Sequence, residues 1–104
     1  MMEKAQLLIV DDEPASRYGI KKALSHLRFN FQEAATGKEA LDKMVALAPE
    51  IVIIDINLPE LDGLSVLSEA KKQSLPSVVI VITAYGSEKI AVDAMTFRAC
   101  EFSL

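Results

Sequence analysis

Residues 51–63, IVIIDINLPELDG, decide the fold, because a short apolar run leads directly into an acidic residue and a turn. The run at its start is β-branched and uninterrupted, as are strands that a parallel sheet buries on both faces. Runs of the same character occur twice more, and a weaker alternating run is typical of an edge strand. Strands are therefore expected at 6–10 (QLLIV), 29–34 (FNFQEA, the edge), 51–54 (IVII), 78–82 (VVIVI) and 99–104 (ACEFSL).

The segments between these runs have helical periodicity. Pro14 favours the start of a first helix, because proline suits the first helical position. Thr36 and Glu39 form a capping box for a second helix, which Pro49 ends. The apolar stripes are expected at Ile20, Ala23, Leu24 and Leu27 in the first helix, and at Leu41, Met44, Val45 and Ala48 in the second.

Two further helices complete the alternation, 64–74 and 87–98, the latter with Ser87 as its cap. Strict alternation of strand and helix predicts an α/β fold with a doubly wound, five-stranded parallel sheet and helices on both faces. The whole chain, 1–104, is interpreted as one domain. The sequence stops directly after the fifth strand, so we expect the fifth helix of this architecture to be missing.

Composition excludes several classes of protein. The chain has 104 residues, 51% of them hydrophobic and 25% charged, as in ordinary globular domains. Its formal charge of −4 is unfavourable for nucleic-acid binding, which needs clustered Lys and Arg. One cysteine allows no internal disulfide, no apolar run is long enough to span a membrane, and there is no signal-peptide cleavage site. These features predict a cytoplasmic protein.

Polar residues follow the predicted strands where a doubly wound sheet places its working groups. Asp11 and Asp12 follow the first strand, Asp55 the third and Thr83 the fourth. Carboxylates packed together repel one another and raise each other's pKa values. Mg²⁺ binds oxygen ligands, so a bound ion would neutralise these charges. Taken singly, the acidic pair would also serve as a helix cap, and Asp62 as part of a simple turn.

Three segments together resemble the receiver domain of bacterial response regulators: LLIVDDEP (7–14), IVIIDINLPELDG (51–63) and VVIVITAYGS (78–87). The resemblance covers essentially the whole chain. It implies a flavodoxin-like sheet with strand order 2-1-3-4-5. It also implies that Asp55 is the phosphorylated nucleophile, and that this residue, Asp12 and the backbone carbonyl of Asn57 bind Mg²⁺ directly. Asp11 is expected to act through a metal-bound water.

The same resemblance assigns roles to three residues near the end of the chain. Thr83 corresponds to the switch hydroxyl that bonds a phosphoryl oxygen. Ala84 is the small residue that leaves room for the phosphoryl group. Phe102 occupies the place of the switch aromatic, although it lacks the hydroxyl of a tyrosine.

The function implied is a phosphorylation-dependent switch that receives its phosphoryl group from a sensor histidine kinase. The segment ITAYGS is similar to receivers of nitrogen-regulator-type transcription activators, so we expect an output domain in a longer parent protein and a role in transcription regulation. Enzymatic activity is not expected, because Asp11-Asp12-Glu13 is not the Asp-x-Asp of aspartyl phosphatases and no glycine-rich phosphate loop follows the first strand.

Two departures from the receiver pattern leave an alternative open. The usual Lys would fall at position 105, beyond the end of this sequence, and Arg98 replaces the usual helix-ending glycine. The chain is therefore interpreted as a truncated receiver, and the alternative is a receiver-like interaction module that is not phosphorylated. A homodimer is expected through the sheet face left uncovered or through the unusually apolar helix 87–98.

Overall fold

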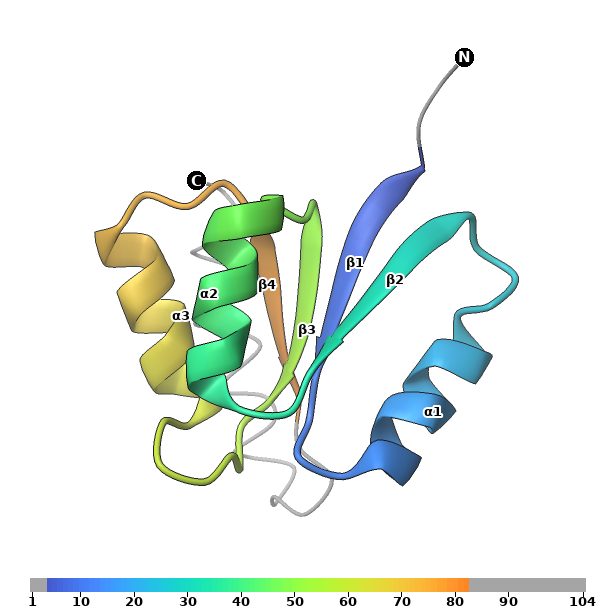
Figure 1. Ribbon diagram of the computed structural model, residues 1–104, viewed down its shortest axis with the longest axis horizontal. Coiled ribbons are helices and arrows are strands. Elements are labelled where there is room, and N and C mark those ends of the chain that lie inside the picture. Colours follow the sequence, from blue (N-terminus) through green and yellow to red (C-terminus); the bar gives the residue numbers. More distant parts are fainter. Residues whose placement is uncertain (1–3, 83–104) are drawn as a thin grey trace.

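The computed structural model describes residues 4–82, which form a four-stranded parallel sheet with three helices (Figure 1). The elements in chain order are β1 (Ala5–Val10), α1 (Pro14–Ala23), β2 (Phe29–Ala34), α2 (Gly37–Leu47), β3 (Ile51–Asp55), α3 (Gly63–Lys72) and β4 (Val78–Ile82). Among these residues no helix is long and apolar enough to cross a membrane. The strand predicted at 99–104 and the helix predicted at 87–98 lie outside the described residues.

The strand order is β2-β1-β3-β4, which confirms the predicted order for these four strands. β1 is central and pairs in parallel with both neighbours, so that Val10 lies opposite Ala34 on one side and Ile54 on the other. The carboxyl ends of β1 and β3 are therefore level with each other. Residues that follow these two strands are brought together at one edge of the sheet.

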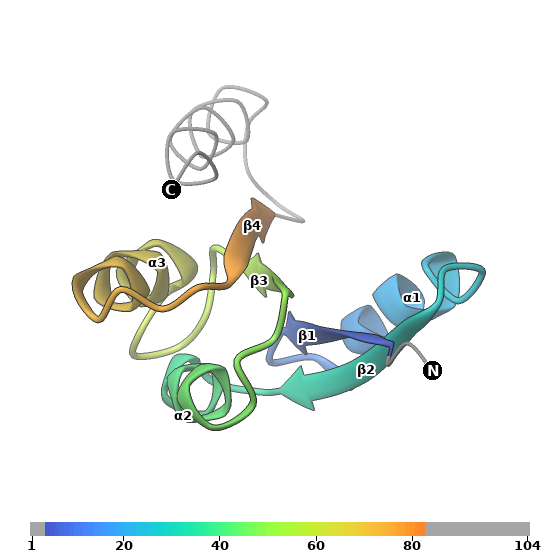
Figure 2. The same cartoon turned by 90° about the horizontal axis from the view of Figure 1, so that it is seen from above.

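The helices form two layers. α2 and α3 cover one face of the sheet, and α1 lies against the other (Figure 2). The main core lies between the sheet and the α2–α3 layer, where alternate residues of the strands meet Met44, Val66 and Leu67. The strand residues in this core are Leu8, Val10, Ala34, Val52, Ile54, Val79 and Val81.

Burial on both faces, expected for all three apolar strands, is found in the described structure only for β1. Leu7 and Ile9 are as fully buried on the α1 side as Leu8 and Val10 are on the other. In β3 and β4, only alternate apolar residues are buried, and the apolar residues facing the α1 side are half-buried. The reason is that α1 is offset toward β1 and β2, and no described helix covers the same face of β3 and β4 (Figure 2).

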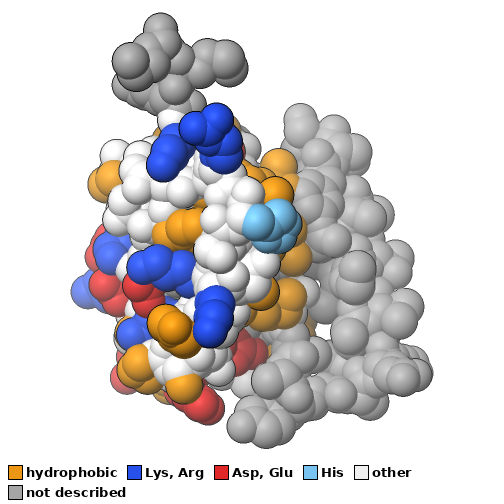
Figure 3. Space-filling view, turned by 90° about the vertical axis from the view of Figure 1, so that its right-hand side faces the viewer, with side chains coloured by type: hydrophobic (Ala, Val, Ile, Leu, Met, Phe, Trp, Pro, Cys, Tyr) orange, Lys and Arg blue, Asp and Glu red, His pale blue; other side chains and the backbone are white. Residues whose placement is uncertain are grey.

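α1 is the most loosely packed of the three helices, because none of its residues is fully buried. It ends at Ala23, so the stripe expected to continue to Leu27 was predicted too long. The side of the molecule on which α1 lies carries basic and hydrophobic side chains close together (Figure 3). Tyr18 is 64% exposed there, with the Lys22 amine 6.0 Å from the centre of its ring.

α2 begins where it was predicted to begin, but the face that it buries differs from the predicted one. The Thr36 hydroxyl accepts a hydrogen bond from the Glu39 N–H, and the Glu39 carboxylate accepts one from the Ala35 N–H, one residue earlier than in a standard capping box. The expected stripe was wrong at Val45 and Ala48, which are exposed. The buried residues are Gly37, Ala40 and Met44. Gly37 must be small, because a Cβ there would collide with the backbone carbonyl of Leu61 in the loop before α3.

Candidate functional site

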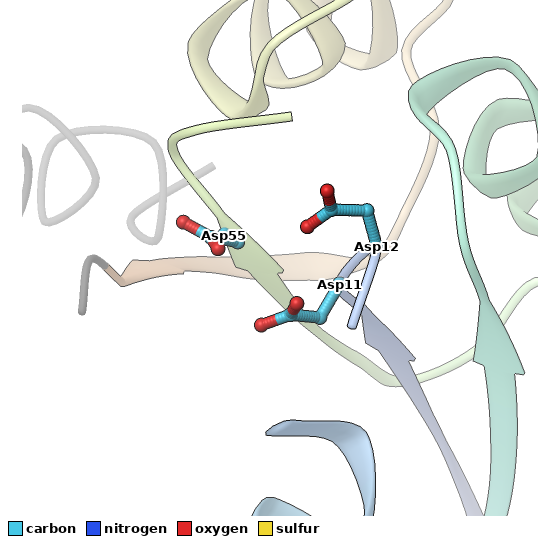
Figure 4. Close-up of side chains that lie close together, drawn as sticks. All are labelled: Asp11, Asp12 and Asp55. Carbon is cyan, nitrogen blue, oxygen red and sulfur yellow. The ribbon is translucent and has the colours of Figure 1, made fainter. Parts of the chain in front are cut away.

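Three carboxylates meet at the carboxyl edge of the sheet (Figure 4). Asp11 and Asp12 directly follow β1, and Asp55 is the last residue of β3. One oxygen from each side chain lies within 4.8 Å of the other two. The convergence follows from the parallel register of β1 and β3, in which Val10 lies opposite Ile54.

The two buried acids are each fixed by a turn of their own loop. The Glu13 N–H donates to Oδ1 of Asp11 at 2.9 Å, and the Asn57 N–H donates to Oδ1 of Asp55 at 2.9 Å. In such Asx turns a side-chain oxygen accepts from the backbone two residues on. Asp11 and Asp55 are 4% and 7% exposed, whereas Asp12 is exposed. These two backbone N–H groups therefore orient both buried carboxylates.

The acidic surroundings perturb Asp55. Burial raises the pKa of the Asp55 carboxyl, and the negative charges of Asp11 and Asp12 raise it further, while the Asn57 N–H opposes these effects. The sequence predicted the repulsion between carboxylates. The structure adds that desolvation is the larger cause, because Asp55 ends a strand inside the sheet.

This set of donors suits a hard divalent cation. Mg²⁺ takes oxygen ligands and one or two carboxylates, and a cation here would neutralise the charges that raise the pKa of Asp55. The residues that could hold it are Asp11, Asp12 and Asp55.

The alternative that the acidic pair merely caps α1 does not hold, because the N-cap is Glu13, with no side-chain cap bond. Asp62, in contrast, does cap a helix, since its Oδ1 accepts from the Ser65 N–H at 2.8 Å.

The start of α3 approaches the site very closely. The Gly63 N–H donates to the Ile56 carbonyl at 3.2 Å, and a Cβ at Gly63 would lie 2.6 Å from the carbonyl oxygen of Asp55. Only glycine therefore allows this helix to pack against the end of β3. The close contact supports the backbone of Asp55 at the end of β3.

One basic residue beside the site was missed from the sequence. Arg17 of α1 donates from Nη1 to the backbone carbonyl of Asp11 at 2.6 Å, and its Nε lies 2.9 Å from Oε1 of Glu33. The signal available was positional: Arg17 falls in the first turns of the helix after the acidic pair, and Glu33 comes near the end of the neighbouring strand β2. Both therefore lie at the same edge of the sheet as the carboxylates.

The structure thus brings together Asp11, Asp12 and Asp55, with Asn57 two residues after the end of β3. The three remaining candidates, Thr83, Ala84 and Phe102, lie outside the described residues. Their roles stay predictions.

Comparison with known proteins identifies related sequences and folds. A family model described as the response regulator receiver domain matches residues 7–102. A protein-glutamate methylesterase/protein-glutamine glutaminase from Treponema denticola is 33% identical over 97% of this chain and 28% of its own length. The regulatory protein AtoC from Escherichia coli is 33% identical over 93% of this chain and 21% of its own length.

A solved structure shows the same architecture. The receiver domain of the Francisella response regulator 1452 has a TM-score of 0.77 and 27% sequence identity, over 89% of this chain and 77% of that one. The chain spans less than a third of the length of the Treponema denticola and Escherichia coli relatives. The similarity therefore concerns one domain of those longer proteins.

Proposed function

Because this chain belongs to the family of response regulator receiver domains, we propose that it is a signalling switch in which Asp55 accepts a phosphoryl group from a sensor histidine kinase. The observation that carries the proposal is the convergence of three carboxylates from two adjacent strand ends, with Asp55 buried among them. A buried acid with two acidic neighbours has little structural purpose in itself, because its charge opposes folding. A cation-assisted transfer reaction gives each of the three acids a role.

Mg²⁺ would be held by Asp12, Asp55 and the backbone carbonyl of Asn57, with Asp11 acting through a bound water. When bound, the ion would neutralise negative charge on the phosphoryl oxygens, which is the main requirement of phosphoryl transfer. The protein's own contribution is to hold the acids in place through the Glu13 and Asn57 N–H groups.

In the transfer step, a carboxylate oxygen of Asp55 forms a bond to phosphorus as the bond from phosphorus to the kinase imidazole nitrogen breaks. The electron pair of that bond stays on the imidazole nitrogen, and the product is an aspartyl phosphate. Because the Asn57 N–H holds Oδ1, we assign the new bond to Oδ2. Burial and the neighbouring charges raise the pKa of Asp55 in the metal-free chain, and a bound cation would oppose that shift and keep the carboxylate ionised, as a nucleophile must be.

We propose the remaining candidates as the parts that pass the signal on. The Thr83 hydroxyl would bond a phosphoryl oxygen, Ala84 would leave space for the group, and Phe102 would turn inward as the aromatic switch. The longer relatives include a regulatory protein and a transcriptional regulatory protein, so the expected output is an attached domain that acts in transcription regulation.

The test is covalent modification with a small phosphodonor. The chain is incubated with acetyl phosphate and Mg²⁺, and the product is measured by intact mass and by peptide mapping. We expect one phosphoryl increment on Asp55, and none in Asp55→Asn or in wild type with a metal chelator. Asp62→Asn is the matched control, because it changes an exposed acid outside the cluster and keeps an oxygen that can cap α3.

An increment that persists in Asp55→Asn would assign the phosphoryl group to another residue and contradict the proposal. A chain that binds Mg²⁺ yet gains no phosphoryl group, from acetyl phosphate or from a histidine kinase, would instead be the non-phosphorylated interaction module.

A further inference from the structure

Arg17 joins three parts of the fold through one side chain. It belongs to α1, its Nη1 donates to the Asp11 carbonyl at 2.6 Å, and its Nε pairs with Glu33 of β2 at 2.9 Å. The side chain is only 17% exposed, although α1 has no fully buried residue. The guanidinium group therefore lies between the helix and the sheet rather than in solvent.

The carbonyl that it holds belongs to the acidic loop, residues 11–13. The register between β1 and β3 ends at the pair Val10–Ile54, so the Asp11 carbonyl lies past the last residue that pairs with β3. This carbonyl and the N–H of Asp12 belong to one planar peptide group. A donor that fixes the Asp11 carbonyl therefore also fixes the backbone from which the Asp12 side chain projects.

Asp12 lacks the support that the other two acids receive from the described residues. Among residues 4–82, no side chain or backbone group donates a hydrogen bond to its carboxylate, which is exposed. Asp11 and Asp55 differ, since each has an Asx turn. The position of the Asp12 carboxylate therefore depends on the backbone of the acidic loop.

We propose that Arg17 is a positioning residue, which orients the acidic loop so that Asp12 points into the metal site, with Glu33 as its anchor. The proposal rests on the cation-dependent function above and adds a residue to it. A guanidinium group suits the task, because its planar array of donors reaches two acceptors at once, whereas a lysine amine is a single point charge. The partly exposed ion pair itself contributes little to stability, so its loss should alter the site more than the fold.

The experiment measures Mg²⁺ affinity by calorimetry in wild type, Arg17→Ala and Arg17→Lys, with the fold checked by circular dichroism. We expect Arg17→Ala to weaken Mg²⁺ binding about tenfold, as is typical when a group that orients a metal ligand is lost. Arg17→Lys keeps the positive charge, but it should still show most of that loss, because a lysine amine cannot make the two-point contact. Glu33→Gln, which releases the anchor at nearly constant volume, should give a smaller loss and serves as the test if Arg17→Ala does not fold.

Lys21→Ala is the matched control. Lys21 lies one turn further along α1, its amine is 3.8 Å from the other oxygen of Glu33, and removing it deletes the same charge without touching the acidic loop. Its Mg²⁺ affinity should stay within about twofold of wild type. Removing a positive charge near a cation site favours Mg²⁺ binding by itself, so charge alone cannot explain a loss of affinity in either variant. An equal loss in Lys21→Ala and Arg17→Ala would show that the loss does not depend on the contact with the Asp11 carbonyl and would overturn the proposal, as would wild-type affinity in Arg17→Ala.

A second measurement needs no metal. The amide hydrogen of Glu13, which donates to Asp11, should exchange faster with solvent in Arg17→Ala, whereas the Glu39 amide at the start of α2 should not change. If wild type does not bind Mg²⁺, the cation-dependent function fails. The Glu13 exchange rate still decides the positioning role, and an unchanged rate in Arg17→Ala would overturn it.

Discussion

At the residue scale, Asp55 reduces the stability of the fold at neutral pH. Its pKa is raised in the folded state, by burial first and by Asp11 and Asp12 next. Below its ordinary value of 3.8 the group is protonated in both folded and unfolded chains and has no ionisation effect. As pH rises through the higher folded pKa, the unfolded chain loses its proton more readily, so the folded state becomes relatively less stable.

Asp55→Asn should therefore stabilise the metal-free chain at pH 7. A carboxylate oxygen of Asp11 and one of Asp12 lie within 4.8 Å of an oxygen of Asp55. At such a separation each charge contributes about 1 kcal/mol of repulsion even in water-like surroundings, so a gain of about 1–2 kcal/mol in the free energy of unfolding is expected. Urea denaturation at a series of pH values measures it. The gain should disappear below about pH 4, and a gain that is independent of pH would contradict the electrostatic cause.

Gly63 should tolerate no side chain. A Cβ there would lie 2.6 Å from the Asp55 carbonyl oxygen, so Gly63→Ala must displace either α3 or the end of β3. Overpacking of this kind costs about 1–3 kcal/mol, and the displaced Asp55 should bind Mg²⁺ more weakly. Gly19→Ala on α1 is the control: its added methyl group would meet no atom within 4 Å, so it should gain up to about 1 kcal/mol from helix propensity. Denaturation midpoints of the two variants should move in opposite directions.

At the scale of elements, the end of α2 contains backbone strain that a substitution can remove. Ala48, the C-cap, has φ of 45° and ψ of 56°, a left-handed conformation that costs an L-residue about 1–2 kcal/mol. Ala48→Gly should therefore stabilise the chain by about 1 kcal/mol in thermal or urea denaturation. The same substitution two residues earlier, Ala46→Gly inside the helix, should destabilise it by about 1 kcal/mol. Equal effects at both positions would contradict the strain at Ala48.

The elements also show what a sequence can and cannot reveal. The continuous apolar runs located β1, β3 and β4, and an alternating run located the edge strand β2. The buried face of α2 was misplaced onto Val45, because several apolar residues compete for one helix face and only tertiary contact decides among them. The three acids of the site could be predicted from their positions at the ends of the predicted strands. The hydrogen bond from Arg17 to the Asp11 carbonyl could not be predicted, because sequence periodicity does not show which group a long side chain contacts.

At the scale of the whole molecule, Mg²⁺ should raise the melting temperature. A ligand that binds only the folded state, at a concentration one hundred times its dissociation constant, stabilises by about 2.7 kcal/mol. Asp12→Asn removes an exposed carboxylate of the cluster and should abolish most of the rise, whereas Asp42→Asn on the exposed face of α2 should preserve it. Differential scanning calorimetry with and without Mg²⁺ measures both, and an unchanged response in Asp12→Asn would contradict the site.

The central position of β1 has a consequence for biosynthesis. β1 is made before either of its partners, yet Leu7 pairs with Phe31 on one side and with Ile51 on the other. On a ribosome that adds about 5–20 residues per second, the nascent chain carries an apolar strand with unpaired edges for a few seconds. During that time the LLIV segment exposes apolar surface and unpaired strand edges, which are features that promote aggregation of incompletely folded chains. The sheet can be completed only after β4 has also emerged, because β4 pairs with β3, which in turn pairs with β1.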